Sequence, residues 1–293
     1  MSGRPRAQTE PLAQRIRLGM PQLCGQGLSE HWLLKTAGDL HWQALAATHG
    51  CRPSALQDAQ GRRVYAAFTL VHLRGARLRE VDEDQTLDLR IAHQPLGRSR
   101  HFSQQWAQGP QGEVAQLSLL TAAVVRERAG DNHTVARVPL PTGPTVADAA
   151  LASAAQAADA SVRAVRAQGW RERFALPTQA PLAELPALPE LADWAVTPCP
   201  YNDFNGAGLL YFASFQALAD RAHGHWGLHA TERAAQGVVR ERQMVFHGNV
   251  NPGEALRFRL RALRHTGLGH WSWTQVQRQS DGRCVADLAT LRV

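Results

Sequence analysis

A short loop in the second half of the chain gathers residues that could bind and polarise a carbonyl group. Asp203 and Asn205 lie there with Gly206 and Gly208, just before a stretch with helical periodicity. Glycines let a substrate carbonyl approach the backbone, and a helix N-terminus offers free N–H groups with a partial positive charge. Such a loop can hold an oxyanion, with Asp203 or Asn205 orienting the substrate or a water molecule. The alternative is that both polar residues only cap the helix.

The first half of the chain has a similar loop that lacks this polar pair. Cys24 and Gln26 stand where the second loop has its acid and its amide, while Gly25 and Gly27 keep the loop rich in glycine. The polar pair therefore occurs once, which predicts one composite site instead of two equal ones. His31 follows this loop closely enough to face a bound ligand, although a structural histidine is the simpler interpretation.

Tyr65 is the candidate nucleophile. It begins an apolar run that is typical of a strand, and its approximate partner in the second half is Met244, so the phenol occurs in one half only. A phenol is mostly protonated at neutral pH and needs its anion stabilised before it can attack a carbonyl group. Arg62 and Arg63 are close in sequence and could supply positive charge, or they could simply be solvated. An aromatic residue in a half-buried strand is the alternative.

Two halves of the chain repeat each other. Residues 20–27 align with residues 199–206 at an offset of 179, and Leu87 and His101 align with Leu256 and His270 at an offset of 169. A later block aligns at an offset of 171. Three colinear blocks with short gaps indicate a duplicated unit.

Each half has the same predicted order of elements. Apolar residues recur at helical spacing, and alternating runs with turn residues between them predict antiparallel strands. The predicted elements are extended segments at 16–20 and 195–199, helices around 33–47 and 212–222, strands around 87–91 and 258–262, and hairpin turns at 111–112 and 281–282.

Each half is predicted to have one helix packed against an antiparallel meander of strands. Two such units in one chain predict an α+β double hot-dog fold. The first unit is predicted to span residues 11–138 and the second residues 193–293. Residues 139–192 are rich in alanine and proline and predict a crossover linker, with one helix near 147–168.

The composition fits a folded chain and narrows the choice of partners. Lysine and arginine number 32 against 25 acidic residues, giving a net charge of +7, and Lys35 is the only lysine. The arginines are spread along the chain without a nucleic-acid-binding motif, so we expect neither DNA nor RNA as a partner. No apolar stretch is long enough to cross a membrane and no targeting segment is visible, so we expect a cytoplasmic protein without a membrane partner.

Metal and cofactor binding are not expected from the sequence. Three histidines lie close together at the end of the second predicted helix: His223, His225 and His229. No cysteine or carboxylate lies at a metal-ligand spacing from them. Phosphate-loop and dinucleotide fingerprints are absent. The four cysteines lie far apart and predict reduced thiols: Cys24, Cys51, Cys199 and Cys284.

Three stretches resemble one family of acyl-thioester enzymes. They are 19–42, GMPQLCGQGLSEHWLLKTAGDLHW; 61–68, GRRVYAAF; and 202–215, NDFNGAGLLYFASF. They are similar to the bifunctional acyltransferase/decarboxylase of leinamycin biosynthesis and its relatives, and the similarity extends over residues 16–293. The resemblance implies a double hot dog that loads the acyl group of methylmalonyl-CoA onto a tyrosine, decarboxylates it and delivers propionyl to an acyl carrier protein. It implies that this tyrosine is Tyr65.

Other functions remain open from the sequence. A plain acyl-CoA or acyl-carrier-protein thioesterase could use Asp203 or Asn205 to activate water. A non-catalytic module could instead dock an acyl carrier protein. On a CoA-binding fold, the arginines would complement CoA phosphates and an acidic carrier protein. Hot-dog sheets commonly pair, so a homodimer is a candidate oligomeric state.

Overall fold

One antiparallel sheet runs through the whole molecule. The computed structural model describes residues 12–141, 148–174, 190–228, 237–267 and 269–293. The strand order is β1-β5-β6-β7-β4-β10-β13-β12-β11-β9, with β8 paired to β7. The strands of the first half are β1 (Ala13–Arg17), β4 (Tyr65–Arg74), β5 (Thr86–Leu96), β6 (Arg100–Gly109), β7 (Gly112–Arg126) and β8 (Val135–Arg137). Those of the second half are β9 (Ala192–Val196), β10 (Val239–Phe246), β11 (Leu256–Thr266), β12 (Gly269–Arg278) and β13 (Cys284–Arg292). A small hairpin, β2 (Leu23–Cys24) and β3 (Gly27–Leu28), lies apart from this sheet.

The register of the strands confirms the internal repeat. Leu89 pairs with Ala107 in the first half, and Phe258 pairs with Val276 in the second half, each residue displaced by 169. The same order of strands runs outward from the centre in both directions. The two halves meet where β4 pairs with β10, with Leu70 opposite Val245. The fold is the predicted α+β double hot dog.

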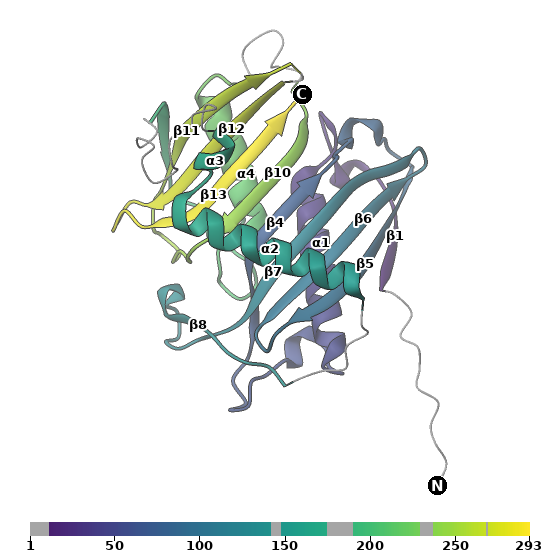
Figure 1. The fold of residues 1–293 in the computed structure, drawn as a ribbon, viewed down its shortest axis with the longest axis vertical. Helices are drawn as coiled ribbons and strands as arrows, with labels where there is room; N and C mark the ends of the chain where they lie inside the picture. The colour runs from purple at the N-terminus through teal and green to yellow at the C-terminus, as the bar shows by residue number, and fades with distance from the viewer. Residues whose placement is uncertain (1–11, 142–147, 175–189, 229–236, 268) are drawn as a thin grey trace.

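Two helices lie on one face of the sheet, behind it in Figure 1. They are α1 (Glu30–Thr48) and α4 (Phe212–His225), near the predicted helical stretches. Their buried residues form one apolar core with the inner faces of both halves of the sheet. The two helices approach closely at Gly38, where an added Cβ would lie 2.6 Å from the ring of Phe212.

A third long helix, α2 (Ala149–Gln168), crosses the opposite face of the sheet (Figure 1). Asp148 caps its N-terminus by accepting a hydrogen bond from the backbone N–H of Leu151, and an apolar stripe that includes Leu151 and Val165 packs on the sheet. This helix confirms the one predicted within the linker. Because α2 contacts β5, β6 and β7 as well as β10, it covers strands from both halves.

The starts of the two halves differ from the sequence prediction. The first strands lie at Ala13–Arg17 and Ala192–Val196, about three residues before the predicted extended segments. In the first half the chain leaves the sheet after Arg17, because a 3-10 turn with Pro21 begins at Met20. Both predicted hairpin turns do separate neighbouring strands, and all four cysteines are free.

A buried ionic network ties both inner helices to the central strands. Arg242 of β10 contacts Glu30 of α1 at 2.7 Å and Asp220 of α4 at 2.8 Å. Arg292 of β13 contacts Asp220 at 2.6 Å. Burial of its carboxyl opposes ionisation of Asp220, but Arg242 and Arg292 outweigh burial and lower its pKa. No helix within the described ranges is long and apolar enough to span a bilayer.

Candidate functional site

A cavity of about 300 Å³ lies where the two halves meet. Its walls come from β4, from the middle of α1 and from the loop before α4. Three of the residues singled out in the sequence, Tyr65, Asn205 and Gly206, share this cavity. The complete lining is Gly38, Asp39, Trp42, Arg63, Tyr65, Ala66, Phe68, Asn205, Gly206, Ala207, Leu209 and Tyr211.

Tyr65 is half-buried at the first position of β4, and two arginines lie over its ring. The guanidinium carbon of Arg63 is 5.3 Å from the ring centroid, and that of Arg126 is 5.9 Å away. Arg62 is engaged elsewhere, in an ion pair with Asp58 at 2.7 Å. The ring of Tyr65 therefore lies between the cavity and two guanidinium groups in cation–π contact with it.

The sheet register corrects the partner assigned to Tyr65 in the second half. Met244 pairs with Leu288, just as Leu73 pairs with Leu117, and both residues are displaced by 171. Met244 is therefore the counterpart of Leu73. The prediction was wrong because it applied the offset of 179, found for residues 20–27, to β4. A gap in the alignment lies between the first helix and β4 and changes the offset to 171.

Asn205 organises the loop through its own side chain. Its Oδ1 accepts hydrogen bonds from the backbone N–H groups of Ala207 at 2.9 Å and Leu209 at 3.1 Å. Since Oδ1 is occupied, the group that Asn205 can offer to a ligand in the cavity is the Nδ2 amide, which donates. Gly208 has a φ of +68°, a conformation that glycine adopts without strain. Asn205 can therefore bind a carbonyl oxygen, whereas an amide cannot act as a general base.

Asp203 is buried beneath the loop and does not belong to the cavity lining. Its Oδ2 accepts a hydrogen bond from the backbone N–H of Cys199 at 2.7 Å. Its carbonyl oxygen accepts hydrogen bonds from the backbone N–H of Tyr211 and the hydroxyl of Ser214. The N-cap residue of α4 is Tyr211. Asp203 thus fixes the loop and the start of α4, and its carboxylate is not placed to activate water in the cavity.

Two residues from the first half hold the loop of the second half in place. Arg126, the last residue of β7, donates from Nη2 to the carbonyl oxygen of Ala207 at 2.6 Å. Asn132 donates from Nδ2 to the carbonyl oxygen of Gly208 at 2.7 Å. Because Arg126 also lies over Tyr65, it joins the candidate nucleophile to the loop. Sequence reasoning missed Arg126, since its position at the end of a long strand carries no motif.

The loop of the first half lies outside this cavity. Gly25 is exposed, and Gly27 packs so closely that an added Cβ would overlap the carbonyl oxygen of Leu78. Gln26 accepts a hydrogen bond from Nε of Arg79 at 2.8 Å. These contacts give the first loop a structural role, so the structure does not bring Gly25 and Gly27 together with Tyr65.

His31 joins the two inner helices. Its Nδ1 lies 3.1 Å from the carbonyl oxygen of Ala213, which makes Nδ1 the donor in this contact. Burial and the nearby charge of Lys35 lower the pKa of His31, so the ring is neutral near pH 7. It is not among the residues that line the cavity.

Residues of α1 that carry no sequence motif complete the cavity. Gly38, Asp39 and Trp42 face it, and Asp39 is an exposed carboxylate on this wall. A smaller cavity of about 40 Å³ shares Phe68 and Asn205 with the larger one and reaches Phe212 at the start of α4. The start of that helix therefore borders the site, as the loop sequence predicts.

The histidines at the end of α4 do not form one cluster among the residues described. Nε2 of His223 lies 2.9 Å from the hydroxyl of Thr274, and His225 packs on the ring of Trp194. His229 lies outside the described residues.

No family model and no curated protein matches this sequence. Among solved structures, the chain is similar to a 12:0-ACP thioesterase from Umbellularia californica, with a TM-score of 0.60, 9% identity, and coverage of 96% of this chain and 93% of the other. An acyl-ACP thioesterase from Bacteroides thetaiotaomicron gives a TM-score of 0.60 at 9% identity and covers 96% and 97%. A protein described as an oleoyl thioesterase from Lactobacillus plantarum gives 0.62 at 10% identity and covers 98% and 97%. At these identities the similarity shows the hot-dog fold over nearly the full chain.

Proposed function

We propose that this protein is an acyl-thioester enzyme that transfers an acyl group from CoA to an acyl carrier protein and decarboxylates it on the way. The observation that carries the proposal is the shared cavity of Tyr65, Asn205 and Gly206, with Arg63 and Arg126 over the phenol ring. The hot-dog fold of the similar thioesterases agrees with a thioester substrate. (Methyl)malonyl-CoA is the substrate implied by the sequence resemblance.

In the first step, the Tyr65 oxygen attacks the thioester carbonyl, the C–S bond breaks, and the phenol proton leaves with the CoA thiol. The Nδ2 amide of Asn205 can donate a hydrogen bond to the carbonyl oxygen while it carries negative charge. Arg63 and Arg126 hold the ring of Tyr65 in place beside the cavity during this step.

In the second step, the C–C bond to the carboxylate breaks and carbon dioxide leaves. Its electron pair forms an enolate, which takes up a proton at the α-carbon. The enolate oxygen occupies the position of the earlier oxyanion, so the same donors stabilise it. The thiol of the carrier protein then attacks the acyl-tyrosine, and Tyr65 is regenerated.

The test is Tyr65→Phe, incubated with methylmalonyl-CoA and a carrier protein. Intact-mass spectrometry should find an acyl adduct on the wild-type chain and none on the variant. Tyr201→Phe is the matched control, because Tyr201 is fully exposed in the loop at 93% relative accessibility. Undiminished loading of the carrier protein by Tyr65→Phe would refute the tyrosine mechanism.

A thioesterase is the second candidate, and Asp39 favours it. This carboxylate lines the cavity from α1 and accepts a hydrogen bond from Gln43 at 2.7 Å. A carboxylate on the cavity wall can activate water for attack on the thioester. Release of free acid from acyl-CoA without a carrier protein, abolished in Asp39→Asn and retained in Tyr65→Phe, would favour this function. Tight binding of a carrier protein without turnover of any acyl-CoA would instead indicate a docking module.

We further propose that the protein acts in the cytoplasm, where acyl-CoA and carrier proteins occur. A homodimer and the boundaries of the two units, 11–138 and 193–293, remain predictions.

A further inference from the structure

A second, larger cavity lies on the opposite face of the sheet. It has a volume of about 560 Å³ and is bordered by the C-terminal end of α2 and by strands of the second half. Because α2 covers the face away from α1 and α4, this cavity is distinct from the one that holds Tyr65. It is lined by Val165, Arg166, Ala167, Gln168, Gly169, Arg171, His247, Arg261, Trp273, Gln275, Cys284 and Asp287.

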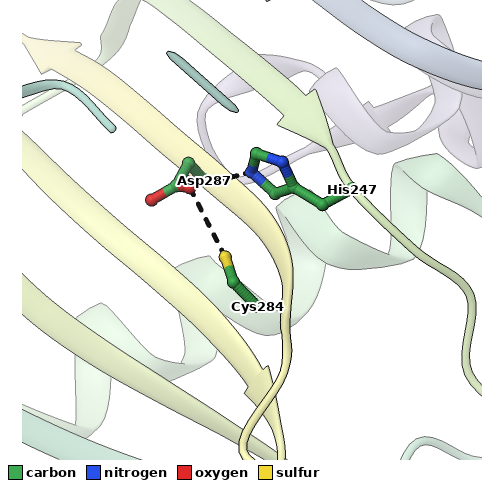
Figure 2. A group of neighbouring side chains, drawn as sticks. All are labelled: His247, Cys284 and Asp287. Carbon is green, nitrogen blue, oxygen red and sulfur yellow. Dashed lines mark hydrogen bonds and ion pairs between the residues drawn. The ribbon is translucent and has the colours of Figure 1, made fainter. Parts of the chain in front are cut away.

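Three side chains with metal-binding atoms converge on this cavity. Nε2 of His247 lies 2.8 Å from Oδ2 of Asp287, and Sγ of Cys284 lies 3.4 Å from the same oxygen. The three ligand atoms all lie within 4.8 Å of one another. Figure 2 shows the imidazole, the thiol and the carboxylate pointing toward one another from the end of β10 and from β13.

The sheet brings these residues together although 37 or more positions separate His247 from the other two. Val245 of β10 pairs with Asp287 of β13, and the backbone N–H of His247 donates to the carbonyl oxygen of Val285 at 2.9 Å. The indole Nε1 of Trp273 donates to Oδ1 of Asp287 at 2.6 Å. This bond orients the carboxylate so that its other oxygen faces His247 and Cys284. Carboxylates that bind metals are commonly held in this way.

The order of these contacts does not suit a cysteine nucleophile. A catalytic cysteine needs an imidazole beside its thiol to take the proton. Here the carboxylate of Asp287 lies between the imidazole of His247 and the thiol of Cys284. The imidazole and the thiol therefore share one carboxylate oxygen, and the imidazole is not placed to take the thiol proton.

We propose that His247, Cys284 and Asp287 bind a divalent metal ion of the zinc type and leave its fourth position open to the cavity. Nitrogen, sulfur and oxygen ligands of this kind suit Zn²⁺ and disfavour Mg²⁺ or Ca²⁺. Tetrahedral zinc places N and O ligands about 3.3 Å apart and S and O ligands about 3.6 Å apart. The present N–O and S–O separations of 2.8 and 3.4 Å require a small outward movement, and the nitrogen and sulfur, within 4.8 Å of each other, would approach to about 3.6 Å.

Charge also fits a divalent ion. Binding displaces the thiol proton of Cys284, so a thiolate and the carboxylate of Asp287 together balance two positive charges. The last turn of α2 borders the cavity and turns the negative end of the helix dipole toward it. Since Arg171 and Arg261 also line the cavity, the open fourth position suits an anionic ligand such as a phosphate or carboxylate.

The experiment uses the full chain without a histidine tag, stripped with a chelator and then dialysed against Zn²⁺. Metal content is measured by mass spectrometry, and Co²⁺ is added in parallel as a spectroscopic probe. We expect about one zinc per chain and a near-ultraviolet charge-transfer band from a cobalt–thiolate bond. Cys284→Ser should abolish the band and weaken binding about 100-fold or more, because even residues that only orient a ligand contribute roughly 10–100-fold.

The matched control is Cys51→Ser, which changes another partly buried free cysteine and should leave zinc binding unchanged. Asp287→Asn and circular dichroism of each variant separate loss of a ligand from loss of the fold. The proposal is overturned if the wild-type chain takes up no stoichiometric zinc, if the cobalt complex shows no thiolate band, or if a folded Cys284→Ser variant binds zinc as tightly as the wild type.

Discussion

Acid should destabilise this protein through four histidines that pack together between α1 and the sheet. The rings of His93 and His101 are stacked with centroids 5.4 Å apart, and His49 and His41 contact this pair at 5.9 and 5.7 Å. His41 is held by hydroxyl groups on both of its ring nitrogens. Such a cluster is stable only while its imidazoles are neutral, because each proton would be buried beside other imidazoles.

Burial, followed by the charge of the neighbouring histidines, lowers the pKa of His93 to about 3 and that of His101 to about 4, from 6.5. The unfolded chain therefore binds more protons below pH 6.5. The stabilisation is fully present above that pH and is lost as the pH falls toward the folded-state values. At about 1.36 kcal/mol per pH unit, acidification by two units below 6.5 lowers the free energy of unfolding by about 2.7 kcal/mol for each residue. Protonation of His93 and His101 together then lowers the free energy of unfolding by about 5 kcal/mol, which is comparable to the whole stability of many domains.

The assay is urea unfolding near pH 7.5, 6 and 4.5. We expect the free energy of unfolding of the wild type to fall by about 5 kcal/mol across this range, and that of His93→Gln to fall by about 2–3 kcal/mol less. His265→Gln, which changes an exposed histidine of β11, should follow the wild type. If His93→Gln loses as much stability on acidification as the wild type, the reasoning is refuted.

Three further substitutions have expected outcomes. Arg242→Met leaves the buried carboxylate of Glu30 without its cation and leaves Asp220 paired with Arg292 alone, and it should lower the free energy of unfolding by about 3–5 kcal/mol. Arg257→Met at an exposed pair should lower it by no more than about 1 kcal/mol, and equal effects in chemical denaturation would contradict this. Gly38→Ala adds a methyl group 2.6 Å from the buried ring of Phe212 and should lower the free energy of unfolding by about 1–2 kcal/mol in chemical denaturation. Gly25→Ala, where the added methyl group meets open space, should leave it unchanged. A stabilised Gly38→Ala variant would show that the helices can separate. Arg126→Gln should slow acyl loading of the candidate tyrosine roughly 100-fold with little change in melting temperature, and unchanged single-turnover rates would exclude its role.

The repeat made most of the fold predictable from the sequence. Leu87, Leu89 and Ile91 align with an equivalent alternating run, and the strand register follows the same offset of 169. The sequence also predicts one composite site, because the first loop has Cys24 and Gln26 where the second has Asp203 and Asn205. That site stays a prediction, although Tyr65 and Asn205 share one cavity and Gln26 lies outside it. Local spacing and duplication carry this information.

The remaining features depend on pairings that local spacing does not encode. Gly38 and Trp42 reach the cavity because α1 and α4 approach closely, and that approach is a property of two helices together. His247 and Cys284 meet through the pairing of β10 with β13. From the sequence we expected Asp203 to orient the substrate or a water molecule, but its carboxylate accepts a hydrogen bond from a backbone N–H of the loop. A sequence motif cannot distinguish these uses of a carboxylate.

The central pairing of β4 with β10 has a consequence for how activity depends on dilution. Tyr65 comes from one half and Asn205 from the other, and one continuous sheet crossed by α2 holds them together. Two separate half-chains would have to associate before this cavity existed, so their activity would fall as the protein was diluted. In the joined chain the effective concentration of one half around the other is fixed by the fold. In the intact chain the cavity therefore forms without an association step, and its formation does not depend on the protein concentration.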